Sequence, residues 1–317
     1  MNRKIFQLPL VLVAFVLSMF LGPFAVAVLT IGLIFGIFAM SEDLCWGYNG
    51  IPNFGHAAYF GFGAFATAIV WKFTGLVWVG IPIAIVASAA LAGVMGFFTF
   101  YSEIRGTYVA LITLAVSLAL QMYSSQEYKY FGGQTGITSI PLLIQLPRDL
   151  MSYELQANYA LVFISTIVVY LLCCRLVNSK FGFLSRAIKS NEHRAKALGY
   201  DTSKHLAITF MLSGALAGFG GALYAHFNRI VAPETLGFLL SAQVFVWTCF
   251  GGPGTLIGPL VGAVFLHVLQ NIISTIYSRV WLLLLGIIFV ISVFFLDQGI
   301  VGLSRRLWRS LLALMRI

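Results

Sequence analysis

The cysteines, histidines and carboxylates of this chain give little sign of enzyme chemistry. None of the four cysteines and five histidines has the spacing of a zinc site. All ten aspartates and glutamates fall in predicted loops or near the ends of apolar runs. An ion-coupled transporter or an intramembrane metalloenzyme usually needs ionisable residues at membrane depth. The sequence therefore favours a chain that is not an enzyme, with no metal site and no bound cofactor of its own.

The most informative polar stretch is residues 178–205, between two apolar runs. It carries six basic residues: Lys180, Arg186, Lys189, Arg194, Lys196 and Lys204. Its apolar residues fall on one helical face: Leu184, Ile188, Ala195 and Leu198. Gly199 is a natural helix stop, and Asp201 or Thr202 could cap the next helix. The pattern predicts a short amphipathic helix-turn-helix, which suits either a groove on a soluble partner or acidic lipid headgroups.

Two other segments are rich in helix breakers, residues 47–56 and residues 250–255. Irregular backbone at membrane depth is tolerated only when it is buried in protein or lines an aqueous cavity. The first segment is therefore either part of a translocation path or an interfacial turn, and the second is interpreted as a turn. Candidate path residues are Tyr48, Asn53, His56 and Tyr59, although His56 suits a hydrogen-bonded packing role equally well.

The elements that must position these residues follow from composition. Hydrophobic residues make up 60% of the 317 positions, charged residues only 9%, and the mean hydropathy is +0.95. A soluble domain carries roughly 25% charged residues, so a nucleic-acid-binding domain, a secreted disulfide scaffold and a disordered chain are excluded. Apolar runs predict an all-α, polytopic transmembrane bundle of about ten spans, two of them short enough to be half-helices. The runs are 5–21, 24–40, 57–73, 76–99, 107–123, 158–177, 206–226, 236–250, 255–274 and 280–297.

The net charge of +9 is explained by topology. Basic residues gather in the 178–205 loop, at Arg3 and Lys4, and near the C-terminus, and the positive-inside rule places all three in the cytoplasm. Six spans before the loop and four after it give the required parity, and the long connection 124–156 falls outside. A signal peptide at 5–21 is the alternative, but a second apolar run follows directly after Gly22-Pro23. Residues 1–317 are thus predicted to form a single transmembrane domain.

Several motifs resemble one family of permeases, and together they cover about residues 30–303. They are Gly55-His56-Ala57-Ala58, Arg105-Gly106-Thr107-Tyr108, Gly132-Gly133-Gln134-Thr135-Gly136, Arg186-Ala187-Ile188-Lys189-Ser190-Asn191-Glu192, Leu212-Ser213-Gly214-Ala215-Leu216-Ala217-Gly218 and Gly251-Gly252-Pro253-Gly254-Thr255. The chain is similar to the ABC transporter permeases of the branched-chain amino acid family, in its LivM-like branch. It departs from the family at Asp297-Gln298-Gly299, where a Pro-Arg-Gly-like turn is usual.

The resemblance implies a permease subunit of an ATP-driven importer in a bacterial inner (plasma) membrane, with both termini cytoplasmic and membrane lipid around it. Expected partners are a second related permease, two cytoplasmic ATPases that bind ATP and Mg, and a periplasmic solute-binding protein. The ATPase-coupling residues would be Arg186, Lys189, Asn191, Glu192, Arg194, Ala195 and Gly199. The spacing from Glu192 to Gly199 is one residue longer than in the general importer loop, and the chain has no phosphate-binding loop of its own.

Two rival functions remain open from the sequence. One lies within the family, a urea or short-amide permease, and Leu198-Gly199-Tyr200-Asp201 would suit it. The other is an ion-coupled secondary transporter, which predicts uptake that collapses with an uncoupler and survives ATP depletion. The carboxylate pattern weighs against this second rival.

Overall fold

The computed structural model describes residues 22–276, 280–295 and 299–302, and within them the chain is helical. The first half contains α2 (Pro23–Asp43), the π-helix η1 (Leu44–Tyr48), α3 (His56–Thr74), α4 (Gly80–Tyr101), α5 (Thr107–Gln126), α6 (Tyr128–Phe131), η2 (Gly133–Thr135) and η3 (Arg148–Tyr153). The second half contains α7 (Glu154–Val177), α8 (Lys180–Ser190), α9 (Glu192–Ala197), α10 (Thr202–Asn228), η4 (Pro233–Leu236), α11 (Phe238–Gly251), α12 (Ile257–Ile276) and α13 (Trp281–Phe295). In this described part the expected all-α fold is confirmed.

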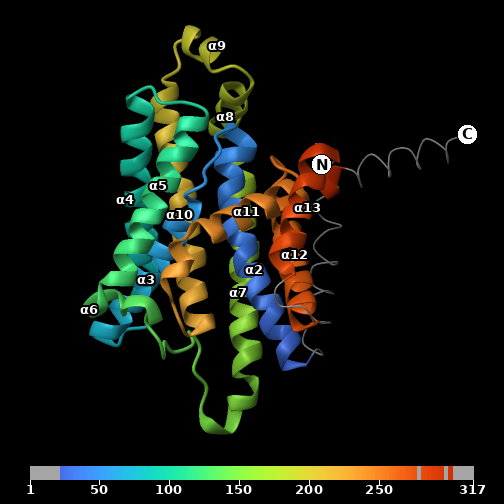
Figure 1. Ribbon diagram of the computed structural model, residues 1–317. Helices are drawn as coiled ribbons and strands as arrows, with labels where there is room; N and C mark the ends of the chain where they lie inside the picture. Colours follow the sequence, from blue (N-terminus) through green and yellow to red (C-terminus); the bar gives the residue numbers. More distant parts are fainter. Residues whose placement is uncertain (1–21, 277–279, 296–298, 303–317) are drawn as a thin grey trace, which may run out of the picture.

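The long helices lie side by side as a bundle, with α8 and α9 at one end and α6 at the other (Figure 1). Helix α10 packs closely against α3 and α4 because its glycines leave room for their backbones. A Cβ added at Gly218 would meet the Ser88 side chain, and one added at Gly214 would meet Ala92. Small residues of this kind permit the close helix–helix approach that is typical of membrane proteins.

Six described helices are long and apolar enough to cross a membrane, fewer than the ten predicted spans. They are Pro23–Tyr48, Gly80–Tyr101, Thr107–Gln126, Glu154–Val177, Thr202–Asn228 and Ile257–Ile276. The apolar run at 57–73 does form α3, although α3 is not among these six. Helix α11 has 14 residues and is about 21 Å long, which is shorter than the hydrocarbon core. The predicted span 5–21 lies outside the described residues.

The two shorter helices α3 and α11 begin next to each other inside the bundle. The Ala57 N–H of α3 donates a hydrogen bond to Ser241 Oγ of α11 at 2.9 Å. The irregular segment before α3 is covered by protein, since Asn53 is fully buried and Ile51 nearly so. An extended stretch therefore leads from η1 into the bundle and ends where two helix N-termini meet.

Residues 252–256 connect α11 to α12, and the predicted turn at 250–255 is confirmed in outline. The turn requires left-handed backbone, with φ of +117° at Gly252, +79° at Gly254 and +58° at Leu256. Only glycine adopts such values at little cost, so Leu256 needs support from its surroundings.

Candidate functional site

The 178–205 loop folds into the short helices α8 and α9, which are separated by a break at Asn191. Asn191 has extended backbone, and its side-chain oxygen accepts a hydrogen bond from the Arg194 N–H at 2.9 Å, which caps α9. The predicted stop is confirmed at Gly199, whose φ is +87°. Of the two cap candidates, Asp201 is the one used, because its carboxylate accepts from the Lys204 N–H at 2.9 Å.

The break at Asn191 changes which apolar residues of the loop face the protein. Ile188 and Ala195 are buried as the amphipathic pattern predicts, and Leu184 is half-buried. The prediction is wrong for Leu198, which is 77% exposed. A single helical period cannot continue through a residue in extended conformation, so α9 takes its own orientation. The outward residues of α9 and the following turn, named here the outer surface, are His193, Arg194, Ala197, Leu198 and Tyr200.

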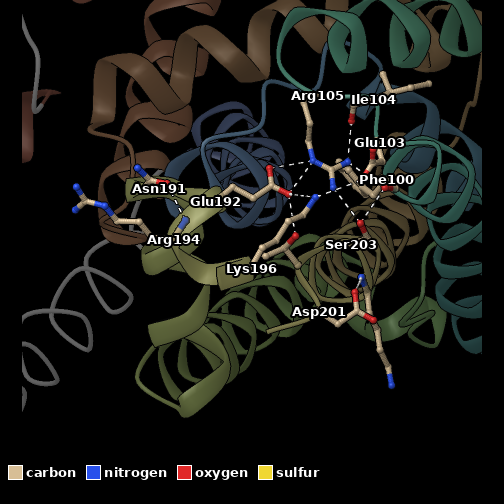
Figure 2. Close-up of polar contacts among 12 residues, drawn as sticks. Phe100, Glu103, Ile104, Arg105, Asn191, Glu192, Arg194, Lys196, Asp201 and Ser203 are labelled. Carbon is tan, nitrogen blue, oxygen red and sulfur yellow. Dashed lines mark hydrogen bonds and ion pairs between the residues drawn. The ribbon is translucent and has the colours of Figure 1, made fainter. Parts of the chain in front are cut away.

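Glu192 does not belong to this outer surface, because its carboxylate turns inward to Arg105 (Figure 2). Arg105 Nε lies 2.9 Å from both Glu192 carboxylate oxygens. Thr202 Oγ1 also donates to Glu192 Oε1 at 2.8 Å. Arg194, by contrast, extends away from this cluster in Figure 2. Two residues that are only two positions apart in the loop therefore face in opposite directions.

Arg105 uses its remaining donors to join three segments of the chain. Its Nη1 donates to the carbonyls of Phe100 and Ile104, each at 3.0 Å, and its Nη2 donates to Ser203 Oγ at 3.0 Å. The side chains of Arg105 and Glu192 are 25% and 22% exposed, so water only partly screens the pair. We call Arg105, Glu192, Thr202 and Ser203 the Arg105 brace. It fixes α9 and the start of α10 against the α4–α5 turn.

Arg105 belongs to a motif that resembles the family, but the sequence predicted no role for it. The available signal was a single arginine between two apolar runs, followed by Gly106, which takes a φ of +63°. A cation in a tight turn at a helix end has nearby carbonyls to bind, and an acidic partner from another loop completes its set of acceptors. The identity of that partner depends on tertiary structure and could not be found from spacing.

The other predicted coupling residues divide between inward and outward positions. Lys189 is an exposed residue whose Nζ turns back to the protein and donates to the Gly47 carbonyl at 2.6 Å. Arg186 is exposed, with its guanidinium 4.6 Å from the centroid of the Phe183 ring. The seven predicted coupling residues therefore do not form one continuous surface.

The four candidate path residues lie within the packed interior. Asn53, His56 and Tyr59 are fully buried, and Tyr48 is 7% exposed. His56 Nε2 is 2.7 Å from Ser41 Oγ, and its Nδ1 is 3.2 Å from Asn53 Nδ2. Tyr59 donates to Met95 Sδ at 3.5 Å. The structure brings Asn53, His56 and Tyr59 together at the start of α3, in hydrogen-bonded packing positions.

Two carboxylates lie deeper than the sequence suggested. Helix α2 continues beyond the predicted end at residue 40 and runs into η1, so Glu42 and Asp43 lie inside the candidate span Pro23–Tyr48. Both are fully buried. Glu42 Oε2 is 3.1 Å from His56 Nδ1, and Asp43 accepts from two backbone N–H groups of the α11–α12 turn. Both remain near the end of this longer span, as expected, but their complete burial was not predicted.

No cluster of three or more histidine, cysteine or carboxylate residues occurs in the described part of the chain. Cys45, Cys173, Cys174 and Cys249 are free thiols.

Comparisons with known proteins identify the family. The family model described as "Branched-chain amino acid transport system / permease component" matches residues 24–293. The chain is 24% identical to the high-affinity branched-chain amino acid transport system permease protein LivM of Salmonella typhimurium, over 96% of this chain and 76% of that protein. It is 25% identical to a probable LivM of Methanocaldococcus jannaschii over 84% of this chain and 89% of that protein.

The similarity extends to a second kind of permease from the same transport systems. The LivH permease of Salmonella typhimurium is 23% identical over 78% of this chain and 84% of that protein. No solved structure matches the chain. The family model covers most of the chain, and the relatives are membrane transport components rather than enzymes. The chain therefore belongs to the family of permease components of branched-chain amino acid transport systems, and it is a multi-pass membrane protein.

Proposed function

We propose that this chain is one permease subunit of an ATP-driven importer that carries branched-chain or related amino acids across a bacterial inner membrane. The observation that carries the proposal is similarity along almost the whole chain to permeases named for high-affinity branched-chain amino acid transport. Similarity to both LivM and LivH supports pairing with a second, related permease. Two ATPases that bind ATP and Mg, and a solute-binding protein, complete the proposed assembly.

The proposed topology keeps residues 1–317 as one transmembrane domain that crosses the membrane ten times. Six crossings are the long apolar helices, and α13 is another. Two more are composite crossings, in which an irregular stretch is followed by a short helix: residues 49–55 with α3, and η4 with α11. Residues 5–21 supply the tenth. With the basic loop 178–205 in the cytoplasm, both termini are cytoplasmic and the 124–156 connection is external.

The ATPase is proposed to bind the loop through the outer surface rather than through all seven coupling residues. Leu198 and Tyr200 are more than half exposed, and Arg194 faces outward beside them. An exposed apolar side chain on a charged loop suits insertion into a groove on a soluble partner. Asn191, Glu192 and Gly199 instead give the loop its shape, by capping, bracing and ending α9. Arg186 adds a second exposed cation on α8.

Transport would follow from rocking between outward-open and inward-open states that ATP binding and hydrolysis bias. Asn53, His56 and Tyr59 adjoin the point where α3 and α11 begin, and Tyr48 precedes the irregular segment that leads there. Breaks of this kind near mid-membrane commonly form transporter sites. We therefore keep these four as path residues, which contact the solute only in a state where α3 and α11 separate.

The decisive experiment reconstitutes the whole importer in proteoliposomes and measures uptake of labelled leucine, isoleucine and valine. Uptake that requires internal ATP and the binding protein, and that persists with an uncoupler, is the expected result. Uptake that survives ATP depletion and collapses with the uncoupler would instead support a secondary transporter. Labelled urea and acetamide test the rival within the family, and preference for them over leucine would reassign the solute.

A further inference from the structure

Lys189 links the 178–205 loop, called here the coupling loop, to the π-helix η1 that follows α2. Lys189 lies in the last turn of α8, and its ammonium group donates to the Gly47 carbonyl of η1 at 2.6 Å. Its side chain passes directly over Gly50, where an added Cβ would lie 3.0 Å from Lys189 Cγ. The contact is therefore both a charge-assisted hydrogen bond and a close packing contact. It joins residues 142 positions apart in the chain.

The same region also contacts the turn between α11 and α12. Asp43, the last residue of α2, accepts from the Gly254 N–H at 2.6 Å through Oδ1 and from the Leu256 N–H at 3.0 Å through Oδ2. Gly47 packs against this contact, and a Cβ there would collide with the Asp43 carboxylate and the Gly254 nitrogen. The backbone of η1 is thus in contact with the turn that begins α12.

Both contacts are made at a segment that differs from ordinary helix. A π-helical turn widens the helix and often marks a functional position, because it can relax to α-helix by a shift of one residue. The turn that Asp43 holds contains three residues with positive φ, among them Leu256. The two Asp43 hydrogen bonds support its shape, together with those that Thr255 Oγ1 makes to the Gly252 carbonyl and from the Gly258 N–H. A displacement of η1 would therefore reach α12 through Asp43.

The coupling loop is attached to the rest of the protein at two points with different destinations. The Arg105 brace fixes α9 to the α4–α5 turn at the end of the bundle. Lys189 fixes α8 to η1, which leads into the segment 49–55 and so to the start of α3. Only the second attachment connects to both the path segment before α3 and the beginning of α12.

We propose that Lys189 and Asp43 are positioning residues that transmit movement of the coupling loop, through η1, to the α11–α12 turn and to the segment before α3. This inference rests on the proposed function, because the movement it transmits is the one that the ATPases impose on α8. Loss of the Lys189 contact leaves the ATPases attached at the outer surface but removes their hydrogen-bonded link to η1. ATP hydrolysis then continues with less solute moved per ATP.

The test compares Lys189→Met, which keeps the length of the side chain but removes the donor, with Lys189→Arg, which keeps a donor. The matched control is Lys180→Met, the same change at another exposed lysine, at the start of the same helix. Leucine uptake and phosphate release are measured together in the reconstituted importer. We expect uptake per ATP to fall at least about fivefold in Lys189→Met, the lower end of ordinary coupling between sites. Lys189→Arg should recover most of it, and Lys180→Met should match the unmodified importer.

A second measurement does not depend on the solute. Hydrogen–deuterium exchange of the peptide that contains Gly254 and Leu256 is followed in the assembled complex, with and without a non-hydrolysable ATP analogue. The analogue should change exchange in the unmodified complex and in Lys180→Met, but not in Lys189→Met. If Lys189→Met does not assemble, Lys189→Gln is used in the same way.

The two measurements separate failure of this inference from failure of the proposed function. An equal exchange response and an equal uptake per ATP in Lys189→Met and Lys180→Met would overturn the link. Absence of ATP-driven leucine uptake in the unmodified importer would count against the proposed function alone, and the exchange response would still decide whether the link exists.

Discussion

Glu192 and Asp43 perform similar structural tasks in two very different surroundings. Each carboxylate ties together segments that are far apart in sequence, and each lies near the end of the bundle that carries α8 and α9. Glu192 is partly exposed and is held mainly by the charged side chain of Arg105. Asp43 is fully buried and is held by two backbone N–H groups of the turn before α12. A carboxylate thus joins distant segments in both places, partly exposed to solvent at Glu192 and fully buried at Asp43.

The difference in exposure indicates which of the two carboxylates, Glu192 or Asp43, can lose its hydrogen bonds and form them again. Water can replace part of the hydrogen bonding when the Arg105 brace opens, so the cost of opening is moderate. Asp43 is fully buried, and its hydrogen bond with the Leu256 N–H is buried with it, so breaking that contact costs more. We infer that the Arg105 brace can open during transport, while Asp43 and the turn before α12 move as a unit.

Removing the buried carboxylate should have the largest effect. Asp43→Ala leaves the N–H groups of Gly254 and Leu256 unpaired, and at about 1–3 kcal/mol for each the free energy of unfolding should fall by about 2–6 kcal/mol. Thermal unfolding of the purified chain in detergent measures this. Asp201→Ala is the control, since Asp201 also accepts a backbone N–H but at an exposed helix cap, and it should cost about 1 kcal/mol. Equal losses in both variants would remove the distinction between the two regions.

Opening the Arg105 brace should have an intermediate effect. Arg105→Met removes the donors to Glu192 and Ser203, which should lower the free energy of unfolding by about 2 kcal/mol, the ordinary range for hydrogen bonds to charged groups. Lys196→Met removes two longer, more exposed contacts, to Glu103 at 3.7 Å and to Glu192 at 3.8 Å, and should cost less than about 1 kcal/mol. Differential scanning fluorimetry of both variants checks the order, and a larger loss in Lys196→Met would contradict it.

Substitution at the outer surface should have the smallest effect on stability and a clear effect on assembly. Leu198→Ser should change the free energy of unfolding by no more than about 0.5 kcal/mol, because the side chain is exposed. Binding of the purified ATPase to the permease pair should nevertheless weaken, as measured by surface plasmon resonance. Leu150→Ser, the same change at an exposed leucine in the 124–156 connection, is the control. Unaltered ATPase binding in Leu198→Ser would remove Leu198 from the proposed docking surface.

The sequence predicted the parts of the fold that depend on local chemistry. Apolar runs located the long helices, and Gly199 and Asp201 marked a helix stop and start because both act within a few residues. The extension of α2 through Glu42 and Asp43 was not predictable in this way, because a buried carboxylate needs partners that only the fold supplies. The pairing of Arg105 with Glu192 was missed for the same reason, with 87 positions between the two residues.

The functional-site predictions also depended on whether the interacting residues are close together in the sequence. Asn191 was named as a coupling residue, but its role as a helix cap was not, although asparagine is among the most favoured cap residues. The four path residues were selected for their polarity beside helix breakers, and three of them do lie at one place in the bundle. Whether they touch solute depends on a state in which α3 and α11 separate, so it stays a prediction.

The hydrogen bond between Ala57 and Ser241 has a consequence for how the chain is made. These residues are 184 positions apart, and Asp43 likewise finds its partners 211 and 213 positions later in the chain. During synthesis of the middle of the protein, the N-terminal helices are already in the membrane. At that stage the Ala57 N–H and the Asp43 carboxylate do not yet have these hydrogen-bond partners. Contacts of such long range slow folding and expose intermediates. Biogenesis of this permease should therefore be vulnerable to membrane proteases until the segment beyond residue 256 has been inserted.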